Sequence, residues 1–419
     1  MRLLTLTNAI LPSGERADVH IANDEILEVV VHGHRSNGRA VKTAGTSSEV
    51  DLDGFLLLPA PAEPHSHFDK ILTSRFLESR SGDLEGAVAA WYGYRDKAGV
   101  DEIQERAAEG AEMLLMNGAT AVRTHIDVGE SVGLRFIEAT VALRERLSHV
   151  LDLQIVAFVD NPIAGEAGSK NRDLLCEALD AGADVVGGAP YRDADPARSQ
   201  RMLLEIAERY GRPADLHTDE TLDAGVLWVE RLPGLVRKLG LNGRVAASHC
   251  VSLGMQPPHV SAVVACDIAE AGVAVITCPA TNLYLQGRDR EQAVPRGLTA
   301  LNQLRAADAL IAAGGDNIQD PFYPIGSGDP LETAALLVSA GHFSAEAAYE
   351  AVSNGARRAM GLPEIRLERG SAAELLAVRA TSTREAIARR ATSRIVIRRG
   401  AIIARTDVTR SMMTELSQR

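Results

Sequence analysis

The middle of the chain alternates apolar, strand-sized runs with segments of helical periodicity. Strands that alternate with helices predict parallel neighbours, because the chain has to cross back before each new parallel strand. Eight such units close a (β/α)8 barrel, so the alternation predicts an α/β fold of the TIM-barrel type. The eight apolar runs lie at residues 55–64, 120–126, 153–158, 184–187, 214–217, 245–249, 273–278 and 310–316.

Helix signals separate these runs. The clearest predicted helix covers residues 101–117, with Asp101 as its N-cap and Gln104 reaching back to it. Gly118 follows directly and is typical of the position just after a helix. The same signals predict two further helices, at residues 196–210 and 257–271.

Both ends of the chain have a different pattern, with short strands and few helices. Strand-like runs lie at residues 3–11, 17–22, 25–31, 373–378 and 393–403, and a polar, Gly/Ser-rich stretch at 33–49 predicts a surface loop. We therefore expect one small β-sandwich domain built from both termini. The expected boundaries are residues 1–58 and 364–405 for this composite domain, 59–363 for the barrel and 406–419 for a C-terminal tail.

Composition narrows the class of protein. Of 419 residues, 46% are hydrophobic, which is ample for a large core. The 56 acidic and 44 basic residues leave a net charge of −12, which argues against nucleic acid or an anionic membrane as partner. The four cysteines form no CxxC pair, and no run of 18 apolar residues is present. These features predict a cytoplasmic protein with a small-molecule substrate, and we expect a homo-oligomer.

Candidate chemistry begins at Glu63-Pro64-His65-Ser66-His67, directly after the first barrel run. Residues i and i+2 of a strand point to the same side, so two imidazoles at this spacing can converge on one metal ion. Histidine is the commonest protein ligand for a metal, and imidazole suits zinc or iron. An isolated HxH is also compatible with two unrelated polar residues at the end of a strand.

Further polar residues stand at the ends of later runs, where barrel enzymes build their sites. Three imidazoles and one carboxylate are enough to hold a catalytic divalent ion. That set is His65, His67, His217 and Asp316. The other polar residues in or after these runs are His125, Gln154, Glu220 and His249.

The chain resembles the amidohydrolase superfamily and, within it, the cytosine deaminase branch. The resemblance spans most of the barrel and is carried by residues 63–69, 122–128, 153–158, 182–187, 215–220, 247–249, 285–288 and 316–324. It implies a TIM-type barrel with a split terminal β domain. It also implies a hydrolase that acts on carbon–nitrogen bonds of cyclic amidines.

Carried over by position, the resemblance implies a site with one metal ion. The implied ligands of one Fe²⁺ or Zn²⁺ are His65, His67, His217 and Asp316. Glu220 is implied as the proton shuttle, and His249 as the residue that positions the attacking hydroxide. Asp316 can also take the proton of the attacking water, and Gln154 is expected to bind the amide edge of a pyrimidine.

Two features bear on the reaction and the substrate. The fourth strand ends without a lysine or a bridging carboxylate, which favours one metal ion and deamination over ring opening. Asn317 stands after Asp316 where cytosine deaminases usually have a second aspartate, and this form looks closer to relatives that act on amino-triazines. Relatives that remove alkylamines from triazines generally lack the His-x-x-Glu arrangement of His217 and Glu220, which favours deamination.

The sequence therefore predicts a metal-dependent deaminase that releases ammonia from a cytosine-like ring and leaves a ring carbonyl. Asn317 is the expected second substrate-binding residue, because its amide both donates and accepts hydrogen bonds. Isocytosine, creatinine-like, pterin and amino-triazine rings stay open as alternatives. A non-catalytic metal-binding barrel is the alternative from a different class.

Overall fold

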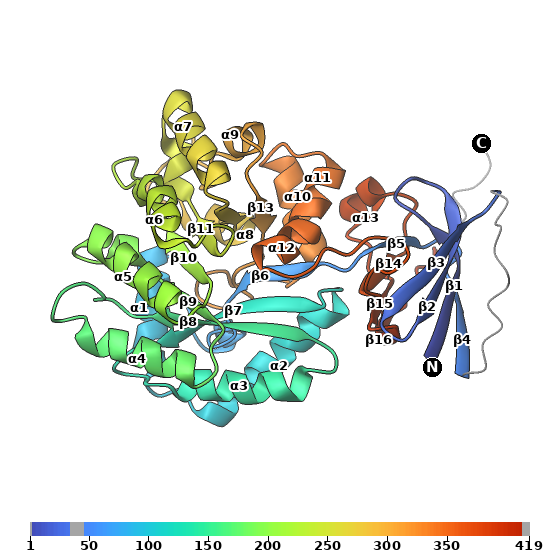
Figure 1. Ribbon diagram of the computed structural model, residues 1–419, viewed down its shortest axis with the longest axis horizontal. Helices are drawn as coiled ribbons and strands as arrows, with labels where there is room; N and C mark the ends of the chain where they lie inside the picture. The colour runs from blue at the N-terminus through green and yellow to red at the C-terminus, as the bar shows by residue number, and fades with distance from the viewer. Residues whose placement is uncertain (1, 34–45, 413–419) are drawn as a thin grey trace. The chain divides into compact units, whose positions relative to one another are not determined.

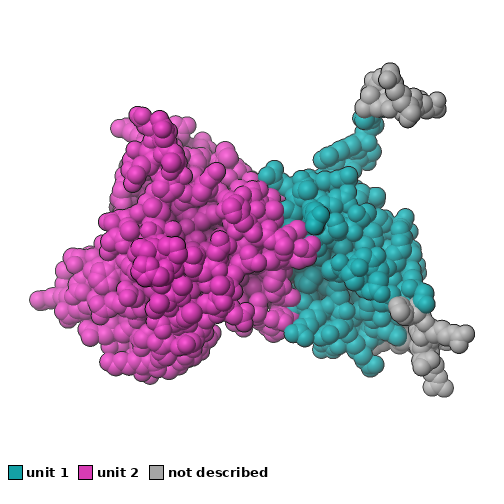
Figure 2. Space-filling model, turned by 90° about the horizontal axis from the view of Figure 1, so that it is seen from above, with its two compact units in different colours: residues 1–60, 116–118, 365–419 teal, residues 61–115, 119–364 magenta. Residues whose placement is uncertain are grey.

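A computed structural model of the chain describes residues 2–33 and 46–412. The chain divides into two compact units, coloured separately in Figure 2. One unit comprises residues 1–60, 116–118 and 365–419, and the other comprises residues 61–115 and 119–364.

The larger unit is the predicted barrel. Its eight strands lie side by side in sequence order, and every neighbouring pair is parallel. A parallel bridge between Ser66 and Asp316 joins the first strand to the residues after the last. The strands are β6 (Ala62–Ser66), β7 (Ala121–Val128), β8 (Asp152–Val159), β9 (Val185–Gly188), β10 (Ala214–Thr218), β11 (Val245–His249), β12 (Ala274–Thr277) and β13 (Ile311–Ala313).

Helices surround these strands (Figure 1) and bury one apolar face each. In α5 (Pro196–Arg209), the buried face includes Leu203, Leu204 and Ala207, and the Asp195 side chain caps the first turn. The other helices are α1 (Leu84–Arg95), α2 (Val100–Met116), α3 (Arg135–Leu147), α4 (Ser169–Asp180), α6 (Leu232–Leu239), α7 (Pro258–Glu270), α8 (Pro279–Leu285), α9 (Leu301–Ala306), α10 (Pro330–Ser339), α11 (Ala345–Val352) and α12 (Asn354–Ala359). Packing of these faces leaves the carboxyl ends of the strands free to carry polar side chains.

The smaller unit is a mixed β-sheet with strands from both ends of the chain. Its order is β16-β15-β14-β5-β1-β2-β3, and β4 pairs with β1. Side chains from both termini share one core, in which Leu6 and Val19 lie in the same cluster as Ile395. The elements are β1 (Arg2–Ile10), β2 (Arg16–Ala22), β3 (Glu25–Val31), β4 (Thr46–Asp51), β5 (Leu56–Pro59), β14 (Leu375–Val378), α13 (Thr383–Arg389), β15 (Arg394–Arg398) and β16 (Ala401–Thr406).

Three sequence expectations are wrong in detail. The run at 55–64 is two strands in different sheets, because Pro61 has no N–H to continue a ladder. Residues 46–49, expected as loop, pair with β1, whereas 34–45 and 413–419 lie outside the described residues. Helix α2 starts at Val100, so Asp101 is not its N-cap, and Gln104 donates to the Ala139 carbonyl instead.

Candidate active site

Four side chains converge at the carboxyl ends of the barrel strands. His65 belongs to β6 and His67 follows it, His217 lies near the end of β10, and Asp316 follows β13. The His217 Nε2 atom lies 3.2 Å from His65 Nε2 and 3.3 Å from His67 Nε2. The Asp316 Oδ1 atom lies 3.3 Å from His67 Nε2 and 3.7 Å from His65 Nε2. The structure thus brings together all four residues that the sequence predicts as ligands.

These separations fit a bound cation. Ligands about 2.1 Å from a tetrahedral metal ion lie about 3.4 Å from one another, which is the spacing of the four atoms. Burial lowers the pKa of His65, His67 and His217 well below the usual histidine value. The imidazoles are therefore neutral and their Nε2 lone pairs are available to a metal. The donor set suits Zn²⁺ or Fe²⁺.

Hydrogen bonds fix the orientation of the His65 ring. Its Nδ1 atom lies 2.9 Å from the Ser248 hydroxyl, which donates to Asp215 Oδ1 at 2.6 Å. Arg123 donates to the other Asp215 oxygen at 2.8 Å. Burial would raise the pKa of Asp215, but the contacts with His125 and Arg123 hold it well below its usual value. This chain of contacts leaves the Nε2 atom of His65 facing the cluster, as ligand histidines generally require.

Glu63 ties the first and last strands together beneath the cluster. Its Oε1 atom accepts from the His65 amide at 3.0 Å, and its Oε2 atom accepts from the Gly315 amide at 2.9 Å. Gly314 leaves room for this carboxyl group, because a Cβ there would lie 2.5 Å from Glu63 Oε1. The side chain therefore sets the separation of His65 and Asp316.

Glu220 and His249 lie beside the cluster. The His249 ring places Nδ1 3.6 Å from Glu220 Oε1 and Nε2 4.0 Å from Asp316 Oδ2. Burial raises the pKa of Glu220 to about 7. A carboxyl group with that pKa can both give and take a proton near neutral pH. Positive φ angles at His249 (69°) and Asp316 (65°) hold both residues in left-handed backbone, which is strained for non-glycine residues.

A cavity of about 280 Å³ opens beside these groups. His67, His217, Glu220, His249 and Asp316 line it. Asn317 also lines it, and its side chain is fixed from both ends. Its Nδ2 donates to Asp320 at 2.8 Å, and its Oδ1 accepts from Thr281 at 3.3 Å.

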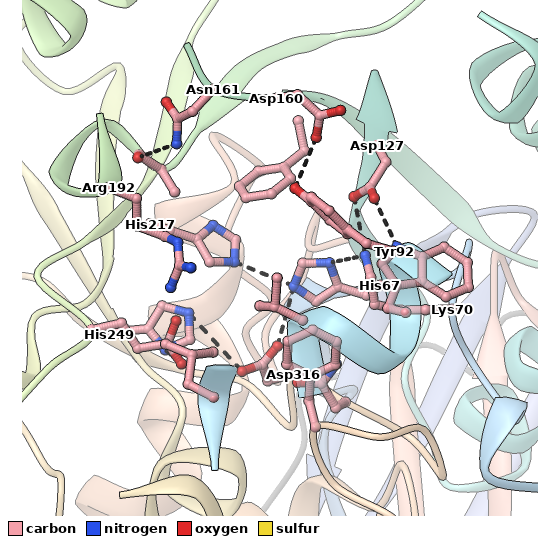
Figure 3. Close-up of a pocket in the computed structure, with 18 of the residues that line it drawn as sticks. His67, Lys70, Tyr92, Asp127, Asp160, Asn161, Arg192, His217, His249 and Asp316 are labelled. Atoms are coloured by element: carbon pink, nitrogen blue, oxygen red, sulfur yellow. Dashed lines mark hydrogen bonds and ion pairs between the residues drawn. The ribbon is translucent and has the colours of Figure 1, made fainter. Parts of the chain in front are cut away.

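The opposite wall of the cavity carries charged groups that the sequence did not predict. Asp127 and Asp160 face it from the ends of β7 and β8 (Figure 3). Arg95 of α1 bridges them, with NH1 2.8 Å from Asp127 Oδ2 and 2.9 Å from Asp160 Oδ1. Trp91 Nε1 donates to Asp127 at 2.8 Å, and the Tyr92 hydroxyl donates to Asp160 at 3.0 Å. Helix α1 thus completes the site from outside the set of barrel strands.

Gln154 is the predicted site residue that the structure does not bring to the cavity. It lies near the start of β8, where its Oε1 accepts from Arg123 at 3.0 Å and its Nε2 donates to the Met360 carbonyl at 3.0 Å. Phe158, four residues and about 13 Å farther along the strand, lines the cavity together with Val159, the last residue of β8. The cavity therefore lies at the carboxyl end of β8, and the Gln154 side chain lies deeper in the barrel interior.

Two other residues lie close enough to enter a metal site. The His125 ring packs on the His65 ring with 4.0 Å between centroids, and its Nε2 lies 3.6 Å from Asp215. Cys278 groups with His65, His249 and Asp316 within metal-ligand reach. Burial raises the pKa of the Cys278 thiol well above its usual value, which disfavours the thiolate form that binds metals.

Among the described residues, no helix is both long enough and apolar enough to cross a membrane.

Several proteins of known function resemble the chain along nearly its whole length. Pterin deaminase from Rhizobium rhizogenes is 28% identical over 409 residues, which cover 94% of this chain and 90% of that protein.

Two solved structures match the fold at similar identity. The 5-methylcytosine deaminase of Klebsiella pneumoniae, liganded with phosphonocytosine, has a TM-score of 0.87 and 29% identity, covering 97% of this chain and 100% of the other. The N-isopropylammelide isopropylaminohydrolase of Burkholderia multivorans has a TM-score of 0.82 and 30% identity, covering 97% and 99%. Residues 120–404 match the amidohydrolase family. The chain therefore belongs to the amidohydrolase family and is a hydrolase.

Proposed function

We propose that this enzyme is a hydrolytic deaminase of a cytosine-like amino-heterocycle, with one Fe²⁺ or Zn²⁺ held by His65, His67, His217 and Asp316. The observation that carries the proposal is the placement of Glu220 and His249 in the same cavity as these four residues. A divalent cation there supplies Lewis acidity, which makes water a nucleophile near neutral pH.

The protein's own groups supply the proton transfers. Addition of water to an amidine-like ring carbon leaves an amine that departs poorly until it is protonated. The Glu220 carboxyl group, with its pKa raised to about 7, would protonate the ring nitrogen, recover a proton that the attacking water loses, and pass it to the departing amine. Asp316 would take the second proton of the water. His249, between Glu220 and Asp316, would orient the attacking water.

The cavity suits a planar ring with hydrogen-bonding edges. Phe158, Phe322 and Trp91 supply aromatic surface, and Asn317 supplies an amide held by two fixed partners. The carboxylates of Asp127 and Asp160 accept hydrogen bonds only, so they favour ring N–H groups at the opposite edge. The relatives named pterin deaminase and 5-methylcytosine deaminase also remove an amine from a heterocycle, which supports the reaction class.

An ammonia-release assay tests the proposal. The panel comprises cytosine, 5-methylcytosine, isocytosine, creatinine, pterin and ammelide, and N-isopropylammelide is followed by release of isopropylamine. We expect ammonia from at least one ring with the wild-type enzyme, and a large loss with Glu220→Gln. Release of isopropylamine alone would replace deamination with the alkylamine reaction, and no product from any ring would refute the proposal.

A further inference from the structure

Two cationic side chains, Lys70 and Arg192, line the cavity, and a third, Arg95, contacts two of the carboxylates that line it. Carboxylates of the cavity wall hold both Lys70 and Arg95. Lys70 Nζ lies 2.9 Å from Asp69 and 3.2 Å from Asp127, with all three side chains nearly inaccessible. Arg95 bridges Asp127 and Asp160, as described above. If either cation moved to bind a ligand, a buried carboxylate would lose its partner and keep an uncompensated charge, which is strongly unfavourable.

Arg192 differs because its partner is exposed. Its guanidinium donates two hydrogen bonds to the Glu85 carboxylate, NH1 to Oε1 at 2.8 Å and NH2 to Oε2 at 3.0 Å. The Glu85 side chain is 72% exposed. Ion pairs of this exposure contribute little, since water solvates the freed carboxylate well. Among the described cations that line the cavity, Arg192 is therefore the one that a ligand can recruit at low cost.

Arg192 lies where two cavities meet. Arg192 lines the site cavity and also a second cavity of about 720 Å³. Leu84, Tyr191 and Glu220 are shared by the two cavities in the same way. A ring in the inner cavity can therefore extend a substituent past Glu220 toward the outer cavity, and this substituent meets Arg192. Four carboxylates line the inner cavity (Asp127, Asp160, Glu220 and Asp316), so an anionic substituent needs a local cation.

We propose that Arg192 is a subsite for a carboxylate carried by the substrate outside its reacting ring. The Glu85 carboxylate occupies this subsite in the structure and shows the bidentate geometry that a guanidinium accepts. Substrate binding exchanges one carboxylate for another, and Glu85 is released to solvent. The inference rests on the proposed deamination and adds a substrate class to it: amino-heterocycles with an acidic side group.

Matched ring pairs test the subsite. The pairs are cytosine with 5-carboxycytosine, and pterin with pterin-6-carboxylate. In the wild-type enzyme, the carboxylated member of the productive pair should have the lower KM. Arg192→Met should raise its KM relative to the plain ring by about 10- to 100-fold, the loss expected for hydrogen bonds to a charged group. The ratio between ring partners is the readout, because Arg192 also lowers the pKa of Glu220 and its loss affects both rings.

Two further variants keep the test decisive. Glu85→Gln removes the competing carboxylate and should lower the KM of the carboxylated ring by about twofold to fivefold, the value of an exposed ion pair. Arg144→Met is the control, because Arg144 has similar exposure (28% against 30%) and pairs with Asp184 away from the cavities. It should leave both KM values unchanged.

The outcomes separate the two proposals. Ammonia release with the same KM ratio in wild type, Arg192→Met and Glu85→Gln would overturn the carboxylate subsite alone. Absence of ammonia from every ring would overturn the deaminase proposal itself. An Arg192→Met protein that does not fold leaves Glu85→Gln to decide, since an unchanged ratio there contradicts the exchange of carboxylates.

Discussion

The main-chain amide of Asp316 donates to the main-chain carbonyl of His65 at 3.0 Å. This bond joins the first strand of the barrel to the segment after the last, at the level where both side chains enter the cavity. Closure of the barrel and assembly of the cluster are therefore one structural event. A change that separates these two backbones should loosen metal binding before it affects the outer helices.

Glu220→Gln should retain metal and lose about 10²- to 10⁴-fold in kcat, because the amide cannot transfer a proton. Burial raises the pKa of Glu220 to about 7. A general acid has to start protonated, so wild-type kcat/KM should fall as pH rises through about 7. The pH profile of kcat/KM measures both effects.

The matched control for that variant is Glu177→Gln, which alters an exposed carboxylate of α4. It should leave the profile unchanged. If kcat/KM of Glu220→Gln still fell as pH rises through about 7, another group would have to supply the proton.

His217→Ala should lower the metal content well below one ion per chain, because it removes one of four ligands and enlarges the site. His125→Ala is its comparison, since His125 packs on His65 but is not one of the four. Elemental analysis of the purified proteins measures the occupancy. Equal loss of metal in both variants would mean that His125 is itself a ligand.

Asn317→Asp places a second carboxylate against Asp320, whose Oδ2 atom now accepts from the Asn317 amide at 2.8 Å. Burial raises the pKa of Asp320 to about 7, so below that pH the pair can share a proton. Above it, two buried charges repel. The loss of unfolding free energy should thus be larger at about pH 9 than at about pH 6. Equal losses at both values would place residue 317 away from Asp320.

Gly129→Ala should destabilise the enzyme by about 1–3 kcal/mol, the usual cost of overpacking. A Cβ at position 129 would lie 2.0 Å from Asp160 Oδ2, so Asp160 would have to leave Arg95. The control is Gly93→Ala in α1, where a Cβ meets no atom within 4 Å and should stabilise the helix slightly. Chemical unfolding compares them, and equal stability of both variants would contradict the packing of Asp160.

Periodicity predicted the barrel because its strands and helices repeat one local pattern eight times. The four predicted metal ligands could be found because each stands at the end of a predicted strand. These residues are His65, His67, His217 and Asp316. Gln154 was misplaced because all β8 side chains on one face look alike in sequence, and only the layer at the strand end reaches the cavity. Asp160 directly follows β8, so its position at the strand end could have predicted it as a residue of the site.

Arg95 and Arg192 could not be found by the same reasoning. Arg95 lies on a helix outside the barrel strands, and it reaches the site because α1 packs over the cavity. Arg192 stands four residues beyond the short strand β9, and the end of that strand indicated only the lack of a lysine or a bridging carboxylate. Their roles depend on which carboxylate each one meets, and such pairings arise from tertiary packing between distant segments.

Anomalous diffraction from crystals of the purified enzyme tests the central claim most directly. The account predicts one peak per chain, about 2.0–2.3 Å from His65 Nε2, His67 Nε2, His217 Nε2 and an Asp316 oxygen. A peak ligated by His125 or Cys278, or two peaks in one cavity, would contradict it.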